Sequence, residues 1–206
     1  MREIVFIDID TQFDFISPEG RLYVPKAEEL IPNLKLLTQE AFKNGILIIS
    51  SLDSHTKNDP EFRQFPAHCV MGSKGQRKIP QTRLRKAVAV SSKILCRREL
   101  LSKVKGYPQV ILEKNTYDVF TNFNLLRLLR PFRKAYVYGV ALDYCVQYAV
   151  LGLLQAGLKV NLVTDAVKPV DVKIEKGLYS KFKENGVNLI TTKEAILRIR
   201  SLRREE

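Results

Sequence analysis

The sequence predicts a doubly wound α/β fold, in which helices flank a mostly parallel sheet. Two observations support this prediction. Short runs rich in Val, Ile and Tyr are apolar on both faces, as the strands of a buried parallel sheet are. These runs alternate with helical patterns that end at glycine, and such alternation favours right-handed crossovers between parallel strands.

Six apolar runs are candidate strands, and the last of them is the weakest. They cover residues 3–9, 46–51, 109–113, 135–139, 159–163 and 187–190. Sheets of this class bind their ligands at the carboxyl ends of the strands. Polar groups that directly follow these runs are therefore the first candidates for a functional site.

Four helices are expected between and after these runs. The first has apolar residues near a 3.6-residue period from Leu30 to Ala41. Gly45, Gly157 and Gly186 stand where three of the helices would end. The expected helices cover residues 27–43, 143–156, 172–185 and 193–203. We expect the charged C-terminal stretch LRIRSLRREE to continue the last helix and to fray at its end.

Residues 52–108 form a long excursion between two expected strands. The excursion opens with polar sequence punctuated by Pro and Gly, and its one apolar patch is AVAVSSKILC. A connection of this length is usually functional or disordered. At 206 residues the chain is long enough for a sizeable core, and we expect residues 1–206 to form a single domain that includes the excursion.

The composition is that of a globular protein, with 45% hydrophobic and 27% charged residues. No apolar stretch approaches the roughly 20 residues that span a bilayer, so we expect no membrane contact. The first residues, MREIVFIDID, lack the cleavage site of a signal peptide, and we expect a cytoplasmic location. Three cysteines at unrelated spacings argue against a disulfide framework.

The net charge of +12 suggests a polyanion as partner. The basic residues are spread along the chain, and they are densest at 74–105 and 197–204. No nucleic-acid motif or array of alternating basic and aromatic residues accompanies them. We therefore interpret the charge as a solvated basic surface and do not expect nucleic-acid binding.

Three kinds of polar group follow the expected strands. IDIDTQFDF contains Asp8, Asp10 and Asp14, ILEKNTYD contains Lys114, and GVALDYC leads to Cys145. A carboxylate can take the proton of a thiol, and an ammonium can steady the charges that develop. A helix N-terminus at the thiol would also lower its pKa. Each group has an ordinary alternative, as a helix cap, a surface charge or a small apolar side chain.

A second cluster lies in SLDSHTKNDPEFRQFPAHC, which contains both histidines of the chain. In an extended segment Asp53 and His55 point to the same side, as a metal-binding pair requires. His68 and Glu61 can complete a nitrogen and oxygen site of the kind that suits zinc, iron or manganese. The alternative is that both histidines are ordinary loop residues.

These motifs together resemble the isochorismatase-like cysteine hydrolases, and within them the nicotinamidase/pyrazinamidase branch. Asp10 lies in the pattern D-x-Q-x-D-F, Lys114 matches the strand-end lysine, and Cys145 lies in the pattern G-V-A-x-x-x-C-V. DSH and FPAHCVMGSKG resemble the metal loop of the nicotinamidase branch. The resemblance runs from VFIDIDTQFDF to NLVTDAV, nearly the whole chain.

The resemblance implies a Rossmann-like isochorismatase-like hydrolase fold and a catalytic triad. In that reading Cys145 is the nucleophile, Asp10 is its base, and Lys114 holds the pair. It also implies a cis peptide between Val140 and Ala141, and an oxyanion hole formed by the backbone N–H groups of Ala141 and Cys145. We interpret Cys69 and Cys96 as structural.

The resemblance further implies a metal centre in the 52–108 excursion. Asp53, His55 and His68 would hold one divalent ion, with zinc the first choice and iron or manganese the alternatives. Glu61 stands where some members have a fourth ligand, whereas others use a histidine.

For the substrate, the resemblance implies that Phe15 and Phe65 flank a flat ring and that Val140 also contacts it. Simple core packing is the alternative for Phe15. The segment KNTYDVFTNF departs from the pattern common in nicotinamidases, and its bulky Tyr117 and Phe120 are expected to reshape the pocket.

The function implied is hydrolysis of nicotinamide to nicotinate and ammonia through a cysteine thioester, as in NAD salvage. The partner would be a small-molecule amide, and the protein a homo-oligomer. One alternative is another isochorismatase-like amidase or hydrolase with a different small substrate. A second is a non-catalytic, polyanion-binding protein of the same fold, which only the net charge supports.

Overall fold

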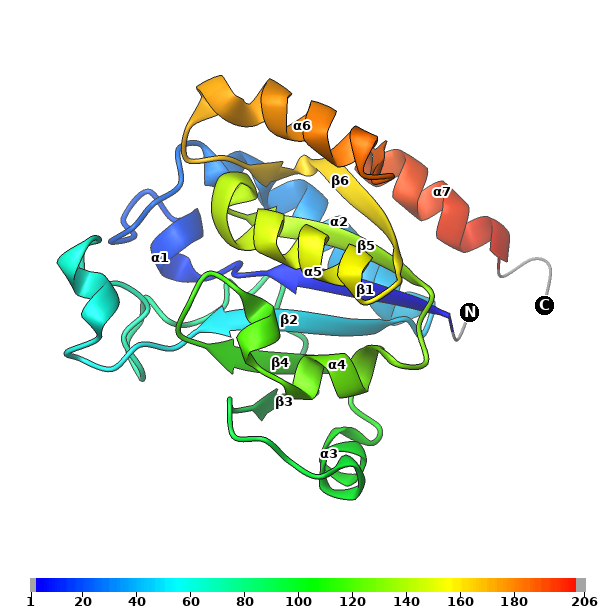
Figure 1. Ribbon diagram of the computed structural model, residues 1–206, viewed down its shortest axis with the longest axis horizontal. Coiled ribbons are helices and arrows are strands. Elements are labelled where there is room, and N and C mark those ends of the chain that lie inside the picture. Colours follow the sequence, from blue (N-terminus) through cyan, green and yellow to red (C-terminus); the bar gives the residue numbers. More distant parts are fainter. Residues whose placement is uncertain (1–2, 203–206) are drawn as a thin grey trace.

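The computed structural model describes residues 3–202, and at its centre lies a seven-stranded sheet in which all neighbouring strands are parallel (Figure 1). The order across the sheet is β3-β4-β2-β1-β5-β6-β7. The strands are β1 (Ile4–Ile9), β2 (Leu47–Asp53), β3 (Ala87–Val90), β4 (Gln109–Lys114), β5 (Lys134–Val140), β6 (Lys159–Lys168) and β7 (Asn188–Ile190). The predicted fold class is confirmed.

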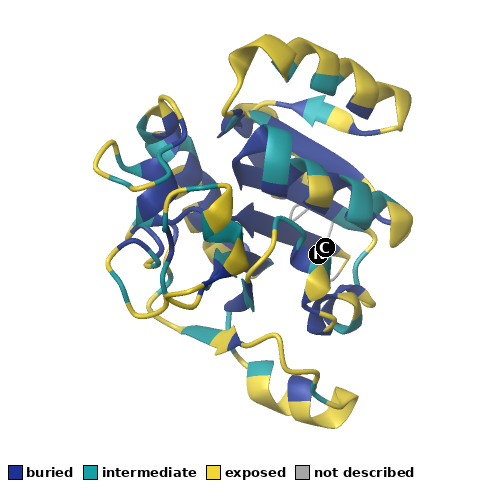
Figure 2. Ribbon diagram, turned by 60° about the vertical axis from the view of Figure 1, so that its left-hand side comes forward, coloured by how far each residue is buried: buried dark blue, intermediate teal, exposed yellow. Residues whose placement is uncertain are grey.

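Helices cover both faces of this sheet. They are α1 (Phe13–Ile16), α2 (Ile31–Lys43), α3 (Arg97–Val104), α4 (Asn124–Leu129), α5 (Gln147–Gln155), α6 (Glu175–Glu184) and α7 (Thr192–Leu202). Buried side chains of α3, α4, α5 and α6 pack in one core, and those of α1, α2 and α7 pack in the other. The strands lie buried between helices whose outer faces are exposed (Figure 2).

The positions of the side chains in β1 explain why its sequence is apolar except at Asp8. Val5, Ile7 and Ile9 belong to the core on one face of the sheet, whereas Ile4 and Phe6 belong to the core on the other. Successive side chains of a strand point to opposite faces, so a strand covered on both faces needs apolar residues at nearly every position. This property made the central strands visible in the sequence.

The edge strand β3 was not predicted. It is formed by the first four residues of the apolar patch in the 52–108 excursion. It pairs with β4, from Ala87 opposite Gln109 to Val90 opposite Leu112. It is only four residues long and is partly exposed, because an edge strand has a neighbour on one side alone. The strand β6 also runs further than predicted, to Lys168, with a register shift against β5.

Several predicted helices begin in a different geometry. Residues 27–30 and 172–174 form turns of 3-10 helix ahead of α2 and α6. The segment predicted as a helix from residue 143 begins as a π-helical turn, Leu142–Val146, in which the backbone of Tyr144 is not helical. Helices α1, α3 and α4 were not predicted. The last helix ends at Leu202, and the expected fraying of residues 203–206 falls outside the described part of the chain.

The excursion returns across the carboxyl ends of the central strands. Gln12 forms an antiparallel bridge with Lys78, and the Lys78 ammonium lies 2.7 Å from the buried carboxylate of Asp8. Lys78 also donates to Thr11. The buried ion pair fixes the excursion against the end of β1, where the site residues lie.

Residues 3–202 contain no helix long and apolar enough to cross a membrane.

Candidate active site

Three central strands bring Asp10, Lys114 and Cys145 to one point. Asp10 directly follows β1, Lys114 is the last residue of β4, and Cys145 lies in the π-helical turn after β5. Lys114 Nζ lies 2.7 Å from Asp10 Oδ2 and 3.7 Å from Cys145 Sγ. All three residues are buried. An acid, an ammonium and a thiol therefore meet, as the strand-end argument predicted.

Asp10 is held in place by Ser51, a residue that the sequence did not single out. The Ser51 hydroxyl donates to Asp10 Oδ1 at 2.6 Å and accepts the Asp10 N–H at 3.1 Å. The backbone of Asp10 has a φ of 46°, in the left-handed region that non-glycine residues rarely adopt. The reciprocal contact with Ser51 stabilises this conformation and leaves Oδ2 directed at Lys114.

The charges in this cluster are strongly coupled. Burial raises the pKa of Asp10, and the Lys114 ammonium offsets only part of the effect. Burial would lower the pKa of Lys114, but Asp10 and Asp53 outweigh it and hold that pKa well above its usual value. Burial also raises the pKa of Cys145 well above its usual value, against the opposing effect of Lys114. The lowered pKa expected from a helix N-terminus is therefore wrong, and the thiol needs a base.

Asp14 is not available as that base. Its Oδ1 accepts the N–H of Arg21 at 3.1 Å, and its Oδ2 accepts the N–H of Cys69 at 2.7 Å. The Cβ of any side chain at Gly75 would lie only 1.9 Å from Asp14 Oδ2. Both oxygens of Asp14 are thus engaged by backbone N–H groups of two loops.

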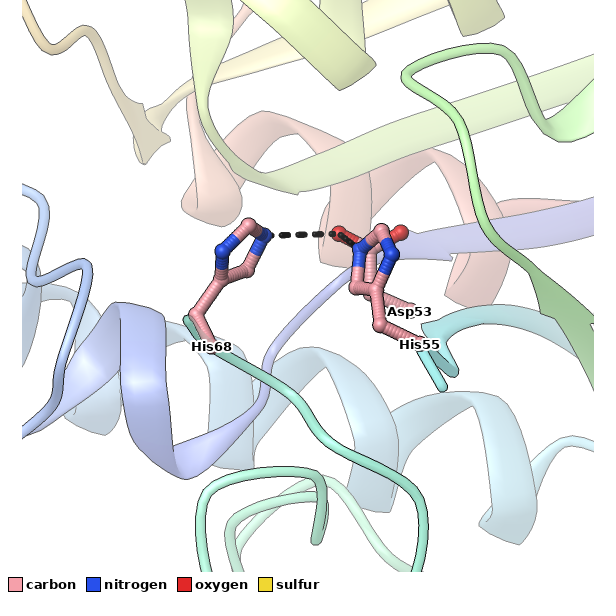
Figure 3. A group of neighbouring side chains, drawn as sticks. All are labelled: Asp53, His55 and His68. Atoms are coloured by element: carbon pink, nitrogen blue, oxygen red, sulfur yellow. Dashed lines mark ion pairs between the residues drawn. The ribbon is translucent and has the colours of Figure 1, made fainter. Parts of the chain in front are cut away.

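The predicted metal ligands also come together (Figure 3). Asp53 ends β2, His55 follows two residues later, and His68 comes from the excursion. The Nε2 atoms of His55 and His68 lie 3.8 Å and 3.9 Å from Asp53 Oδ2. One ligand atom from each of the three lies within 4.8 Å of the others.

The chemistry of these donors fits a divalent metal. His68 Nδ1 lies 2.8 Å from the Pro66 carbonyl, which fixes a proton on Nδ1 and leaves the lone pair of Nε2 facing Asp53. His55 is fully buried, and its Nε2 has no hydrogen-bond partner among the described residues, whereas its Nδ1 makes a bent contact of 3.1 Å with Asp59 Oδ2. A buried nitrogen without a partner is costly, and a metal at Nε2 would satisfy it.

Asp53 belongs to both clusters. Its Oδ1 contacts Lys114 Nζ, whereas its Oδ2 faces the two histidines. Burial opposes the charge of Asp53, but Lys114 and His55 outweigh it and hold the pKa of Asp53 below its usual value. The Gln12 side chain fixes the Asp53 backbone, because it accepts from the N–H at 2.7 Å and donates to the carbonyl at 2.9 Å. The sequence contained Gln12 within a motif, but no role was assigned to it.

Glu61 lies beside this cluster in a 3-10 turn, Pro60–Arg63. Its Oε1 is 3.8 Å from His68 Nε2. Burial raises the pKa of Glu61, with the charge of His55 acting against the rise. Its carboxylate is near enough to the histidines to serve as a further ligand.

A cavity of about 90 Å³ opens above Cys145. Of the residues predicted to contact a substrate, Phe15, Phe65 and Val140 line it, together with Ala141. The Val140–Ala141 peptide is cis, as the resemblance implied. The cavity also has wall residues that the sequence did not identify, namely Leu22, Tyr23, Val24, Tyr144 and Val170. Tyr144 lies in the π-helical turn and the other four lie in loops, and periodicity gives no signal in either.

Tyr117 lies in the cavity wall, whereas Phe120 does not. Tyr117 lines the cavity, and its ring lies 6.1 Å from that of Phe65. Phe120 is not among the lining residues, because its ring packs against α5 at Gly152. A Cβ at Gly152 would lie 2.3 Å from that ring. The expectation that both residues reshape the pocket is correct in geometry for Tyr117 and wrong for Phe120.

The other two cysteines, Cys69 and Cys96, do not contact Asp10, Lys114 or Cys145. Cys69 is buried, and burial raises the pKa of its thiol. Cys96 is exposed and caps α3, where its sulfur accepts the N–H of Glu99 at 3.5 Å. These contacts agree with structural roles for both.

Known proteins resemble this chain in sequence and in fold. The isochorismatase domain model matches residues 4–96 and 96–194. The nicotinamidase of Saccharomyces cerevisiae is 25% identical over 222 residues, covering 89% of this chain and 97% of the relative. The zinc-bound crystal structure of the pyrazinamidase of Pyrococcus horikoshii is 27% identical, with a TM-score of 0.77 and coverage of 92% and 99%. The N-carbamoylsarcosine amidase of Thermoplasma acidophilum shares the fold, with 21% identity, a TM-score of 0.72 and coverage of 92% and 96%.

Proposed function

The chain belongs to the isochorismatase family of hydrolases, and we propose that it hydrolyses nicotinamide to nicotinate and ammonia, a reaction of NAD salvage. One observation supports this proposal most. The Cys145 thiol lines an aromatic-walled cavity and contacts the Lys114 ammonium, which in turn contacts Asp10. Asp53 and His68 of the Asp-His-His cluster line the same cavity. A flat heteroaromatic amide fits the aromatic walls, and its ring nitrogen is a natural metal ligand.

In the proposed reaction Asp10 takes the proton of Cys145, and the thiolate attacks the carboxamide carbon. The backbone N–H groups of Ala141 and Cys145 stabilise the resulting oxyanion. The carbon–nitrogen bond then breaks, and Asp10 returns the proton to the nitrogen, which leaves as ammonia. Asp10 next takes a proton from water, whose oxygen attacks the thioester carbon. The carbon–sulfur bond then breaks to release the acid, and the Cys145 thiolate takes the proton back from Asp10. Lys114 stays charged throughout and balances Asp10.

We propose that Asp53, His55 and His68 hold one divalent ion, with Glu61 as a fourth protein ligand. Zinc suits a set of two imidazoles and a carboxylate, and iron or manganese are the alternatives. When bound, the ion supplies a Lewis acid for the ring nitrogen of the substrate.

The metal is tested by elemental analysis. Purified protein should contain about one divalent ion per chain, and His55→Ala and His68→Ala should lose it, because each removes a neutral nitrogen ligand. Cys96→Ala changes an exposed cap far from the cluster and should keep the ion. Equal metal content in the histidine variants and the parent would refute the assignment.

The substrate is tested by ammonia release, with and without a chelator. Nicotinamide should be hydrolysed, pyrazinamide should also be accepted, and benzamide should be much poorer. Benzamide has nearly the same shape but no ring nitrogen, so the comparison isolates that atom. Equal turnover of benzamide and nicotinamide would exclude this activity.

The alternative is an amidase of the same fold that acts on a non-aromatic amide. This alternative stays open because the loop after Lys114 departs from the pattern common in nicotinamidases. Tyr117 of that loop forms part of the cavity wall, where it can change which amide fits. Turnover of an aliphatic amide, with no reaction of either heteroaromatic amide, would support this alternative. We also propose a cytosolic location, because three free cysteines are typical of a protein in a reducing compartment. We further propose a homo-oligomer, which light scattering of the purified protein tests.

A further inference from the structure

The Asp59 carboxylate lies at the Nδ1 atom of His55, whereas Asp53 lies at the Nε2 atom. Asp59 is buried, and its Oδ2 is 3.1 Å from His55 Nδ1. The other ring nitrogen, Nε2, faces Asp53, whose Oδ2 is 3.8 Å away. The imidazole therefore stands between two carboxylates, one at each nitrogen. The Nδ1 contact is bent, but its length is within hydrogen-bond range.

The second oxygen of Asp59 holds the turn that carries Glu61. Asp59 Oδ1 accepts the Glu61 N–H at 3.0 Å and so caps the 3-10 helix Pro60–Arg63. Glu61 in turn extends to within 3.8 Å of His68 Nε2. One carboxylate thus connects His55 with the segment that offers the fourth ligand.

We propose that Asp59 is a positioning residue for the metal centre. Its Oδ2 keeps the proton of His55 on Nδ1, so that the lone pair of Nε2 is directed at the ion, while its Oδ1 sets the position of Glu61. Carboxylate–histidine pairs of this kind fix the tautomer and the orientation of the ring and raise the basicity of the ligand. This inference rests on the proposed metal site, but it does not depend on which amide is hydrolysed.

A plain helix cap explains only half of these contacts. Asp118 and Asp171 cap other 3-10 turns in the same way, accepting the N–H of Phe120 at 2.8 Å and of Lys173 at 2.9 Å. Within residues 3–202, the carboxylates that contact a histidine belong to Asp53, Asp59 and Glu61. Capping accounts for Asp59 Oδ1, and the histidine contact accounts for Oδ2 and for the burial of the side chain.

The variant Asp59→Asn separates the two roles. The single oxygen of asparagine can still accept the Glu61 N–H, but its amide nitrogen cannot accept a proton from His55 Nδ1. The full-length protein would be stripped of metal and titrated with zinc against a chromophoric chelator. We expect Asp59→Asn to bind zinc about 10- to 100-fold more weakly than the parent. The melting temperature of the metal-stripped variant should stay close to that of the metal-stripped parent.

Asp171→Asn is the matched control, because it makes the same change at an exposed cap without a histidine. It should bind zinc as tightly as the parent. A second readout is the tautomer of His55 in metal-stripped protein, measured by nitrogen-15 NMR. The tautomer should shift away from the Nδ1–H form in Asp59→Asn and should stay unchanged in Asp171→Asn. Unchanged zinc affinity in Asp59→Asn, or an equal loss in Asp171→Asn, would overturn the proposal.

The outcomes also separate this inference from the proposed function. A parent protein that binds no zinc overturns the metal centre and the role of Asp59 together. If the parent binds zinc and Asp59→Asn binds it weakly, the role of Asp59 is supported, even if nicotinamide is not hydrolysed.

Discussion

At the scale of single residues, Lys114 joins the two halves of the site. Its ammonium contacts Asp10 and Asp53 and lies 3.7 Å from the thiol of Cys145. Each buried charge in this group is tolerated because its partner is present, and removal of one partner leaves another uncompensated. Substitutions here therefore affect chemistry and stability in different proportions, and both need to be measured.

The thiol of Cys145 should be the nucleophile. Cys145→Ala should abolish amide hydrolysis, because the attacking atom is gone while the change in volume is small. Cys96→Ala, at an exposed helix cap, and Cys69→Ala should keep much of the activity. The measurement is ammonia release, and turnover in Cys145→Ala equal to that of the parent would eliminate the thioester mechanism.

Asp10 and Lys114 should act with Cys145 as one unit. Asp10→Asn keeps the shape but removes the base, and we expect turnover to fall by about three or more orders of magnitude. Adding Cys145→Ala to Asp10→Asn should cost far less than the product of the two single effects. Lys114→Met should also unfold more easily, since it strands two buried carboxylates and removal of a buried partner costs about 3–5 kcal/mol.

These variants need a thermal melt beside the kinetic assay. Near-parent turnover in Asp10→Asn would mean that another group is the base. Asp53, which offers an oxygen within 4.8 Å of the thiol and of Asp10, would then be the next candidate. Asp14 is excluded by its contacts with Arg21 and Cys69.

At the scale of elements, an ion pair joins α2 and α7 on one face of the sheet. Arg200 makes two contacts with the Glu40 carboxylate, at 3.0 Å from Nε and 2.9 Å from Nη2. The Glu40 side chain is nearly buried, whereas Arg200 is largely exposed. The hydrogen bond from Arg200 is the main reason that the pKa of Glu40 lies below its usual value. The pair fastens the last helix to the body of the protein.

The stability contributed by this pair should depend on pH. Because the pKa of Glu40 is lower in the folded protein, its contribution is full above the unfolded pKa of about 4.3 and is lost as pH falls below it. Glu40→Gln should therefore lower the melting temperature at pH 7, and the difference from the parent should narrow below pH 4.

The control for this prediction is Glu19→Gln, which removes an exposed pair with Lys74. An exposed pair contributes little, so this variant should melt with the parent at both pH values. A difference for Glu40→Gln that stays constant between pH 7 and pH 3 would mean that packing, not charge, is responsible.

At the scale of the whole molecule, the 52–108 excursion is joined to the sheet at several points. It adds β3 to one edge, supplies His68 to the metal cluster, and pairs Lys78 with the buried Asp8. Segments that share buried contacts tend to unfold together. The prediction of a single domain therefore leads to one cooperative transition for sheet and excursion.

Cys69 offers a probe of that transition, because it is buried within the excursion. In a variant with Cys96→Ala and Cys145→Ala, the Cys69 thiol should become reactive at the same urea concentration at which far-UV circular dichroism is lost. Labelling of Cys69 at clearly lower urea would show that the excursion opens independently of the sheet.

The fold class and the residues that meet at one edge of the sheet could be predicted from the sequence alone. Runs such as residues 3–9 are apolar at nearly every position because both faces of the strand are covered, and this signal is local to each strand. Asp10, Lys114 and Cys145 follow strand ends, so their convergence required only that the sheet be parallel. Asp53 and His55 were visible for a similar reason, since their spacing is set within one extended segment.

Features that depend on partners far away in the chain became visible in the tertiary structure. Ser51 holds Asp10 across 41 residues of sequence, and the π-helical turn at Cys145 and the edge strand β3 carry no periodicity of their own. The role of Asp59 depends on the path of a loop between two histidines, and the position of Phe120 depends on the space left by Gly152. The raised pKa of Cys145 has the same origin, because burial is a property of the packed molecule and no local pattern encodes its extent.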